Sequence, residues 1–283
     1  MHLVILLLAV LTAWGLRQIP LGQSPLTWSK TLVRFVFPPL LLLITALALV
    51  FMGYDGQMLG LEMGGLTYLV YGLAVTFLGA SFGFLFYRFY QAQRSRSLLH
   101  QGHQSNIAGK PATVLALTFP YSAQIGFWRS QLVVSQGLIN LLDEEHLASV
   151  LAHEQAHEYY RDTFWFFWLG WLRTITAWLP QTQELWQDLL FLRELRADQK
   201  AVESVDPLVL AESLMFVAQS TSQKPNLEGL EMICAAFQSE NRLLARINGL
   251  LEPATQPCLT QTAWAKWFWL MALIPLLLIP LHY

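Results

Sequence analysis

Two uninterrupted apolar segments of membrane-spanning length constrain the fold of this chain more than any other feature of its sequence. They occupy residues 35 to 53 and 66 to 86, and each approaches the roughly 20 residues needed to cross a hydrocarbon core of about 30 Å. Only 13% of the residues are charged, whereas a soluble globular chain usually carries about a quarter. The sequence therefore predicts a membrane protein built mainly from α-helices.

Two shorter apolar segments add to this pattern. They cover residues 3 to 16 and 267 to 281. The first could instead be a signal peptide, but no Lys or Arg precedes it, so the basic region that opens a signal peptide is missing. We therefore expect three transmembrane helices within residues 1–87, and a fourth with a short external tail within residues 263–283.

The charges of the connecting segments predict the orientation of these helices. Basic side chains follow the first and third apolar segments and precede the fourth, whereas the loop between the second and third holds only acids. The basic residues are Arg17, Lys30, Arg34, Arg88, Arg94, Arg96 and Lys266, and the acids are Asp55 and Glu62. By the positive-inside rule, the N-terminus lies outside and residues 88–262 lie in the cytoplasm.

The cytoplasmic stretch of residues 88–262 is long enough for one domain with a core of its own. After a polar linker over residues 91 to 111, the apolar, β-branched runs at 112–117 and 131–135 predict strands. Helices are expected over residues 143–160, 183–203, 207–220 and 239–251. These elements predict an α+β domain with a small sheet.

A fifth apolar stretch, residues 164 to 179, interrupts this domain. A single crossing would place His153 and residue 194 on opposite faces of the membrane, and a hairpin of two crossings would need about 40 residues. Arg173 within the stretch would also be unfavourable at the centre of a bilayer. We expect the stretch to pack against the helical bundle or to lie in the membrane interface.

The sequence His153-Glu154-Gln155-Ala156-His157 carries the clearest chemical signal. On a helix, residues four apart project from the same face, so the two imidazoles can bind one zinc ion. Glu154 would lie beside the same metal and is the natural general base for a water molecule that the metal activates. The competing interpretation is a helix whose His and Glu side chains are merely solvated or buried in a core.

A catalytic zinc ion usually has three protein ligands and one open position. Glu194 and Asp198 follow downstream, and they also share one helix face. One carboxylate could bind the metal while the other accepts a hydrogen bond from a liganding imidazole. By spacing alone, other acids on the same predicted helix compete for the role of third ligand. These are Glu184, Asp188 and Glu203.

The run QLVVSQGLINLLDEEHLASVLAHEQAHEYYRD, followed by a hydrophobic stretch and ELRADQKAV, resembles the BlaR/MecR-type membrane metallopeptidases of bacteria. The same motifs are similar to those of the HtpX-type and CAAX-processing membrane peptidases. The resemblance implies a gluzincin-like zinc peptidase domain in a multi-pass protein of the bacterial inner membrane. It also implies that Glu194 is the third zinc ligand and that Asp198 supports a liganding histidine.

The resemblance extends weakly to NRLLARINGL, where Arg246 would lie near the site and contact the substrate or the transition state. The chain differs from the antirepressor members in one respect. Those proteins continue after the fourth membrane helix into a penicillin-binding sensor domain, whereas this sequence ends at Tyr283. We therefore expect no direct β-lactam sensing by this chain.

Together these features predict a zinc endopeptidase that cleaves a protein or peptide at the cytoplasmic membrane face. A repressor-inactivating role would add a transcriptional repressor or a separate sensor protein as a partner. The alternatives are an HtpX-like quality-control protease and, from another class, a membrane sensor or scaffold with a vestigial zinc site. The net charge of -2 gives no reason to expect nucleic-acid binding, and the oligomeric state is left open.

Two further residue groups could contact a substrate. The strand at 131–135 would hold an extended peptide if it lay at the sheet edge beside the metal helix, although it could equally be a central strand. We favour the edge position. Tyr159 and Tyr160 are candidates for stabilising an oxyanion, or they could belong to a membrane interface.

Overall fold

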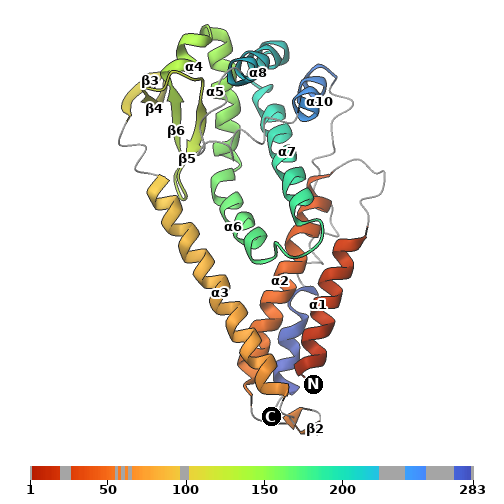
Figure 1. Ribbon diagram of the computed structural model, residues 1–283. Helices are drawn as coiled ribbons and strands as arrows, with labels where there is room; N and C mark the ends of the chain where they lie inside the picture. The colour runs from red at the N-terminus through yellow and green to blue at the C-terminus, as the bar shows by residue number, and fades with distance from the viewer. Residues whose placement is uncertain are drawn as a thin grey trace. The chain divides into compact units, whose positions relative to one another are not determined.

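The computed structural model describes residues 2–19, 27–54, 57–58, 61–62, 66–95, 102–222, 240–252 and 271–281 (Figure 1). The chain separates into two compact units, which we call the helical unit and the sheet unit. The helical unit comprises Met1–Arg88, Leu169–Leu189 and Cys258–Tyr283, and the sheet unit comprises Phe89–Trp168 and Leu190–Pro257. The division resembles the predicted separation of apolar helices from an α+β domain, except that a central segment of the chain returns to the helical unit.

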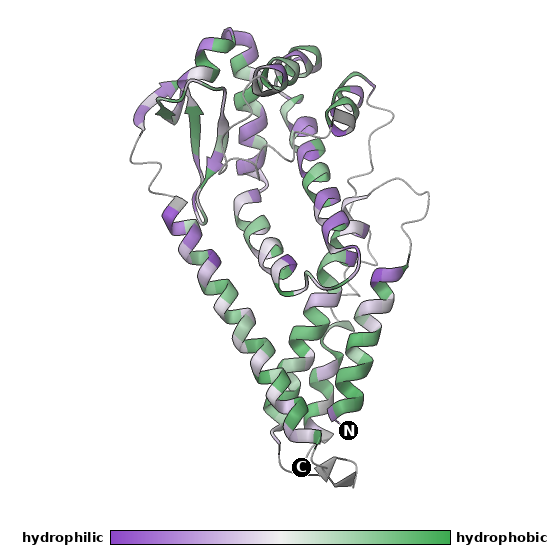
Figure 2. Cartoon of the chain, in the orientation of Figure 1, coloured by the Kyte–Doolittle hydropathy of each residue, from purple (hydrophilic) through white to green (hydrophobic). Residues whose placement is uncertain are grey.

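Three helices begin the helical unit, at the positions where the apolar segments predicted them. They are α1 (His2–Gln18), α2 (Trp28–Met52) and α3 (Leu66–Ser95). By length and composition, α2 and α3 are able to cross a membrane, whereas α1 is shorter. Figure 2 shows apolar residues along most of all three helices.

The two longer helices differ in how much of their apolar surface is buried. Phe37 and Leu41 of α2 pack with Ala9 and Ala13 of α1 in the core of the helical unit. In α3, by contrast, large apolar side chains face outward, and Phe86 is 76% exposed. Contiguous exposed apolar surface is unfavourable in water, so it indicates contact with a partner or with lipid.

Of the α-helix expected over residues 267 to 281, only residues 271–281 belong to the described part of the chain. The described part forms a short 3-10 helix, η3 (Ile274–Leu281), which contains Pro280. Proline lacks a backbone N–H and disfavours a regular α-helix, so Pro275 and Pro280 explain the irregular geometry. A fourth transmembrane helix and the proposed domain boundaries stay predictions.

A four-stranded sheet forms one layer of the sheet unit. Its strands are β3 (His103–Ile107), β4 (Lys110–Leu115), β5 (Ser122–Ile125) and β6 (Gln131–Ser135). The order across the sheet is β3-β4-β6-β5, with β4 parallel to β6 and both outer pairs antiparallel. β4 and β6 confirm the two predicted strands.

The polar linker expected over residues 91–111 is wrong in its described part. α3 continues to Ser95, and β3 occupies His103–Ile107. β3 is an edge strand that pairs with β4 alone, so it needs no apolar side chain on its solvent-facing side. Its polar composition therefore resembled that of a linker.

The edge position favoured for residues 131–135 is also wrong. β6 lies between β4 and β5, and the four residues from Leu132 to Ser135 are all buried. An apolar strand of this kind is typical of a sheet interior. The edge strand on this side of the sheet is β5. It pairs with β6, although it precedes β6 in the sequence.

α4 (Gln136–Leu141) follows β6 directly, and then come α5 (Glu144–Tyr159), α6 (Asp162–Ile175), α7 (Thr182–Ala201), α8 (Pro207–Ser222) and α10 (Glu240–Leu251). Four of these helices, α5, α7, α8 and α10, lie where the sequence predicted helices, whereas α4 and α6 were not predicted as helices. The Asp143 side chain caps α5 by accepting a hydrogen bond from the His146 backbone N–H at 2.9 Å. Val150 and Leu151 anchor α5 to the sheet core.

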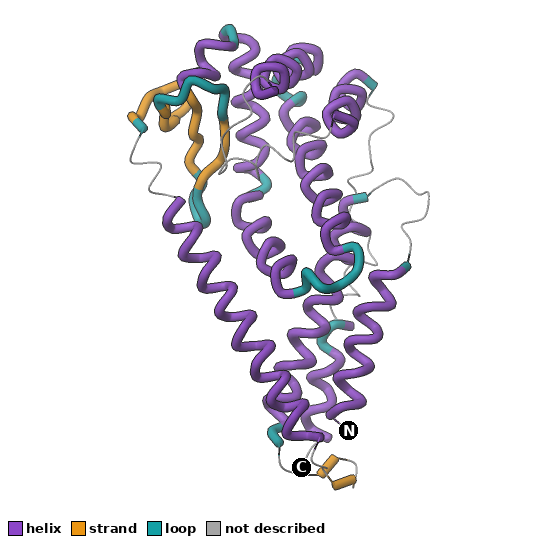
Figure 3. Tube along the Cα trace, in the orientation of Figure 1, coloured by secondary structure: helices purple, strands orange, loops and turns teal. Residues whose placement is uncertain are grey.

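The fifth apolar stretch forms α6 and the loop before α7, which Figure 3 shows as consecutive elements. α6 has 14 residues, so it is about 21 Å long and too short to cross a hydrocarbon core. In its second half, Trp171 Nε1 donates to the Ser81 carbonyl of α3 at 2.8 Å. Burial of this half within the helical unit agrees with the first of the two predicted placements.

Candidate metal centre

Helix α5 places two imidazoles side by side. His153 and His157 are four residues apart, and their ring centroids are separated by 4.7 Å. The two Nε2 atoms face each other at 3.1 Å. This arrangement follows directly from the helical repeat, because side chains at positions i and i+4 lie on one face.

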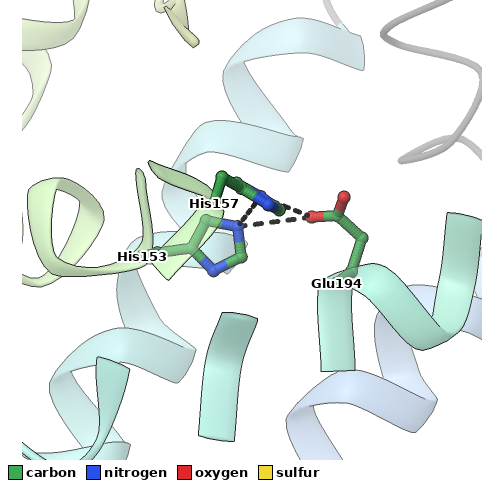
Figure 4. A group of neighbouring side chains, drawn as sticks. All are labelled: His153, His157 and Glu194. Atoms are coloured by element: carbon green, nitrogen blue, oxygen red, sulfur yellow. Dashed lines mark hydrogen bonds and ion pairs between the residues drawn. The ribbon is translucent and has the colours of Figure 1, made fainter. Parts of the chain in front are cut away.

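Helix α7 supplies a carboxylate to the same point. Glu194 Oε2 lies 3.3 Å from His153 Nε2 and 3.7 Å from His157 Nε2 (Figure 4). The other oxygen, Oε1, accepts hydrogen bonds from Arg193 Nε and Nη2 at 2.9 and 2.6 Å. Oε2 is buried and accepts no hydrogen bond from the described residues. One oxygen is thus held by an arginine, and the other points at the two imidazoles.

The Nδ1 atom of each imidazole contacts a further carboxylate. His153 Nδ1 lies 2.8 Å from Asp198 Oδ1, although this contact departs from the linear geometry of a good hydrogen bond. His157 Nδ1 lies 2.8 Å from Asp162 Oδ2. A proton on each Nδ1 leaves the Nε2 lone pairs directed toward Glu194, which is the tautomer that a metal ligand requires.

Arg246 of α10 completes the support of His153. Its Nε and Nη2 donate to Asp198 Oδ2 and Oδ1, both at 2.7 Å, in a buried bidentate pair. Its Nη1 lies 3.6 Å from Glu194 Oε2. Arg246, which the sequence indicated only weakly, is therefore part of the site, where it positions the Asp198 carboxylate. The substrate or transition-state contact expected of Arg246 stays a prediction.

The charges of the site shift the pKa values of its members in opposite directions. Burial alone would raise the pKa of Glu194, but Arg193 and the two imidazoles hold that pKa well below its ordinary value. Burial would likewise lower the pKa of His153, but the carboxylates of Asp198 and Glu194 raise it to about 9. These directions describe a compact cluster of negative carboxylates around two imidazoles, an environment that favours a cation.

The spacing of the three inward atoms fits a zinc ion. Ligands held about 2.0–2.1 Å from a tetrahedral zinc are about 3.3 Å apart, and the three observed separations are 3.1, 3.3 and 3.7 Å. His153, His157 and Glu194 also form the group of potential ligands whose atoms all lie within 4.8 Å of one another in the described part of the chain. Oε2 of Glu194, which accepts no hydrogen bond from the described residues, is the atom that such an ion would satisfy.

The competing acids do not share this position. Glu203 pairs with Lys200 at 2.6 Å, and Glu184 and Asp188 belong to the portion of α7 that lies in the helical unit. Among the described residues, Glu194 is the acid of α7 that lies within reach of both imidazoles.

Glu154, which follows His153 on α5, is buried, and its carboxylate is held by the sheet. Its Oε1 accepts a hydrogen bond from Ser122 Oγ at 2.7 Å. Ser122 begins β5, the edge strand of the sheet. The candidate base is therefore fixed to the strand that an extended peptide could pair with.

Sequence reasoning missed two residues that this geometry brings in, Ser122 and Asp162, and it considered nearby arginines such as Arg193 and Arg196 only as surface partners of Glu194. Asp162 is also paired with Arg196 of α7. The position of Asp162, five residues after His157, could have indicated the contact between these two residues. The metal helix was expected to end near Tyr160, and a turn directly after it can bring Asp162 back to His157. Arg161 makes this turn with a backbone φ of 53°.

The two candidate tyrosines are not directed at the three ligands in any described contact. Tyr160 lies beneath the Arg196 guanidinium, 4.1 Å from its ring centroid. Tyr159 is 67% exposed and is contacted by Lys200. A role for either of them in stabilising an oxyanion stays a prediction.

A helix bearing two imidazoles and a carboxylate, with a third ligand from a second helix, defines the class of metal site used by metallopeptidases. Residues 91–218 match the profile of Peptidase family M48, a family of zinc metallopeptidases. The matched range contains His153, Glu154, His157, Glu194 and Asp198. The match supports a metallopeptidase and the M48 family. The chain has no match among curated proteins or solved structures.

Proposed function

We propose that this chain is a zinc-dependent endopeptidase of the membrane, in which His153, His157 and Glu194 bind the metal and Glu154 is the general base. The observation that carries this proposal is the convergence of three lone-pair atoms with Glu154 alongside. Oε2 of Glu194 is buried without a hydrogen-bond donor among the described residues. Such an atom is costly to leave unsatisfied, and a cation accounts for it.

Zinc and the carboxylates of the site would have separate roles in peptide hydrolysis. When bound, zinc would polarise the scissile carbonyl and make water a better nucleophile. Glu154 would take the proton of the attacking water and later deliver it to the leaving amine. Because Ser122 occupies Oε1 of Glu154, Oε2 is the oxygen that moves the proton. Asp198 and Asp162 would keep both imidazoles in the required tautomer.

Strand β5 offers a place for the substrate backbone. It pairs with β6 on one side and is the last strand in the described sheet order. The unpaired side of an edge strand can hold an extended peptide through main-chain hydrogen bonds. Ser122 on this strand holds Glu154, so a peptide bound there would lie near the candidate base. This assigns to β5 the role that the sequence had suggested for residues 131–135.

A membrane location is part of the proposal. Helices α2 and α3 have the length and composition of membrane spans, and α3 exposes large apolar side chains such as Phe82 and Phe86. The loop charges favour a cytoplasmic peptidase unit. Alkaline extraction of cell membranes, with a soluble protein as control, should leave the chain in the pellet. Release into the supernatant would exclude the membrane-spanning arrangement.

The central experiment compares the purified protein with Glu154→Gln. We expect both proteins to contain about one zinc ion per chain, and only the first to cleave an unfolded protein such as casein. The matched control is Glu158→Gln, one helical turn along α5 on an exposed carboxylate. Cleavage retained by Glu154→Gln would refute the mechanism, and absence of bound zinc would favour a scaffold with a vestigial site.

The biological role is the finer part of the proposal. The BlaR/MecR-type resemblance favours a regulatory protease with a repressor as its substrate, and the HtpX-type resemblance favours turnover of damaged membrane proteins. Cells that carry Glu154→Gln should accumulate one dominant uncleaved protein in the regulatory case. A broad set of stabilised membrane proteins would instead indicate quality control.

A further inference from the structure

The turn that joins β5 to β6 carries two large aromatic side chains. It comprises residues 126–130. Gly126 begins this turn with a backbone φ of 137°, and a Cβ at this position would collide with the Arg129 carbonyl. Glycine tolerates both constraints, so the β5–β6 turn has a defined shape. Phe127 and Trp128, which follow this glycine, are therefore carried on a tightly folded backbone.

The Phe127 ring lies at the centre of a group of packed rings in the sheet unit. Its centroid is 5.2 Å from that of Phe164 and 4.7 Å from that of Phe167, both on α6. It also contacts the ring of Phe89, near the end of α3, at 6.2 Å. Aromatic rings at such separations attract one another beyond the burial of their surface. The β5–β6 turn is thus held against the start of α6 and the end of α3.

Two tryptophans extend from these packed rings into solvent. Trp128 is 65% exposed, and Trp165 of α6 is 57% exposed. Both contact the Phe164 ring, at centroid distances of 5.4 and 5.2 Å. Exposed apolar surface of this kind indicates contact with a partner or with lipid. Tryptophan in particular is enriched at membrane interfaces, because its ring is apolar while its N–H can stay hydrated.

The packed rings lie where the chain passes from one unit to the other. α3 leaves the helical unit after Arg88 and α6 enters it at Leu169, so Phe89 and Trp168 are the adjacent residues of the sheet unit. Both of these rings contact Phe127. The long apolar segment of α3 ends three residues before Phe89, which is less than one helical turn. The β5–β6 turn therefore lies at the level where α3 is expected to leave the bilayer.

Two arginines accompany the exposed tryptophans. Arg129 follows Trp128 directly, and the Arg161 guanidinium lies 5.3 Å from the Phe164 ring centroid. Both arginines are exposed, and neither forms an ion pair with the part of the chain that the structure describes. Guanidinium groups bind phosphate well, and the cytoplasmic leaflet carries negatively charged lipids. The charges beside the tryptophans are therefore complementary to lipid headgroups.

We propose that the β5–β6 turn and the start of α6 form a membrane-interface anchor, in which Trp128 and Trp165 insert among phospholipid headgroups. Arg129 and Arg161 bind the lipid phosphates beside them. The inference rests on the membrane location in the proposed function, and it adds a direct contact of the sheet unit with the bilayer surface. It does not depend on peptidase chemistry.

The anchor has a consequence for the substrate. β5 ends directly before the anchored turn, and Ser122 on this strand holds the candidate base Glu154. Ser122 precedes Trp128 by six residues, which is at most about 20 Å of extended chain. The strand proposed to bind the substrate is thus kept close to the bilayer. This favours a polypeptide whose cleavage site lies within a few residues of its own membrane anchor.

Quenching by labelled lipids tests the anchor directly. Trp128→Cys and Trp165→Cys are made separately in protein that carries Cys234→Ser and Cys258→Ser, labelled with the fluorophore NBD and placed in nanodiscs of phosphatidylcholine and phosphatidylglycerol. A phospholipid with a nitroxide near its headgroup should lower the emission of both labels several-fold. The matched control is Leu141→Cys, which is 41% exposed and whose label should keep its emission.

The control position follows from the topology of the sheet. Leu141 ends α4, which begins at the end of β6 opposite to the β5–β6 turn. Incorporation into nanodiscs with no quenching at either tryptophan position would overturn the anchor alone. Equal quenching of the Leu141→Cys label would also overturn it, because lipid contact would not be confined to the turn. Failure of the whole chain to enter nanodiscs would instead reject the proposed membrane location.

Cleavage measures the consequence for the substrate. Both tryptophans are replaced in a Trp128→Ser, Trp165→Ser double variant, which is compared with the wild type in the same nanodiscs. The variant should cleave soluble casein at the wild-type rate and a lipid-anchored peptide several-fold more slowly. An equal loss with both substrates would show that the tryptophans bind the substrate itself, and would overturn the anchor. Quenching in a wild-type background that cleaves neither substrate would retain the anchor and reject the peptidase.

Discussion

Asp162 Oδ2 lies 2.8 Å from Nδ1 of His157, and its other oxygen is paired with Arg196. Asp162 begins α6, directly after the left-handed residue Arg161 that ends the turn from α5. The junction between two helices therefore returns a carboxylate to the imidazole that precedes it. This contact fixes which nitrogen of His157 faces Glu194.

Asp162→Ala should weaken zinc binding about 10- to 100-fold, because loss of the carboxylate leaves the ring of His157 free to turn and to change tautomer. Asp162→Asn should weaken zinc binding much less, because its amide oxygen can still accept a hydrogen bond from the Nδ1–H of His157. Competition with a chromophoric chelator measures both affinities. Glu203→Ala, an exposed acid near the end of α7, serves as control. Equal affinities for Asp162→Ala and the control would show that the contact does not orient His157.

Arg246→Met should destabilise the sheet unit by about 3 kcal/mol, because it leaves the buried carboxylate of Asp198 without its bidentate partner. The control on the same helix is Arg242→Met. The Arg242 guanidinium lies 5.7 Å from the Phe191 ring centroid, and its removal should lower the free energy of unfolding far less. Thermal unfolding of the detergent-purified proteins compares the two. Similar melting temperatures for both variants would contradict a structural role for the Arg246–Asp198 pair.

The part of the site that follows from local geometry could be predicted from the sequence. His153, Glu154 and His157 lie within two turns of one helix, so their common face is set by the helical repeat alone. Glu194 is 37 residues beyond His157, and spacing could not distinguish it from Glu184 or Glu203. A family resemblance made that choice, because it carries the tertiary information that spacing lacks.

The missed features depend on contacts between distant segments. Strand order placed Ser122 beside Glu154, 32 residues away, and nothing in the short polar run of β5 indicates that it forms an edge. The orientation of Asp162 depends on a single left-handed residue at Arg161. Elements with strong periodicity were thus predictable, whereas edges, turns and the outer carboxylates were set by the tertiary fold.

Ser122→Ala should lower kcat about tenfold while zinc content and KM stay near those of the wild type. The hydroxyl holds Oε1 of Glu154 at 2.7 Å, and a base that is no longer fixed is less often in position to take the proton. Steady-state kinetics with metal analysis of the same samples separate the two effects. Ser105→Ala, on the opposite edge strand β3, is the matched control. A rise in KM alone would instead indicate that Ser122 contacts the substrate.

His146 predicts a pH dependence of stability that does not involve the metal ligands. Its Nδ1 lies 2.7 Å from Asp143 Oδ1 and its Nε2 lies 3.2 Å from Glu212 Oε2 of α8. The hydrogen bond that His146 donates to the Asp143 carboxylate, together with the nearby Glu212, raises the pKa of His146 above its ordinary value, against a smaller opposing effect of burial. A raised folded-state pKa gives a stabilisation that is complete below about pH 6.5 and is lost as the pH rises through the folded-state value.

The melting temperature of the wild type should therefore exceed that of His146→Gln by more at pH 6 than at pH 8.5. Both acidic partners are solvent-exposed, so the difference should be small and should shrink in high salt. A parallel pair of curves across this pH range would contradict the assignment. Glu212→Gln should reproduce part of the effect, because it removes the contact to α8 and leaves the contact to Asp143 at the start of α5 in place.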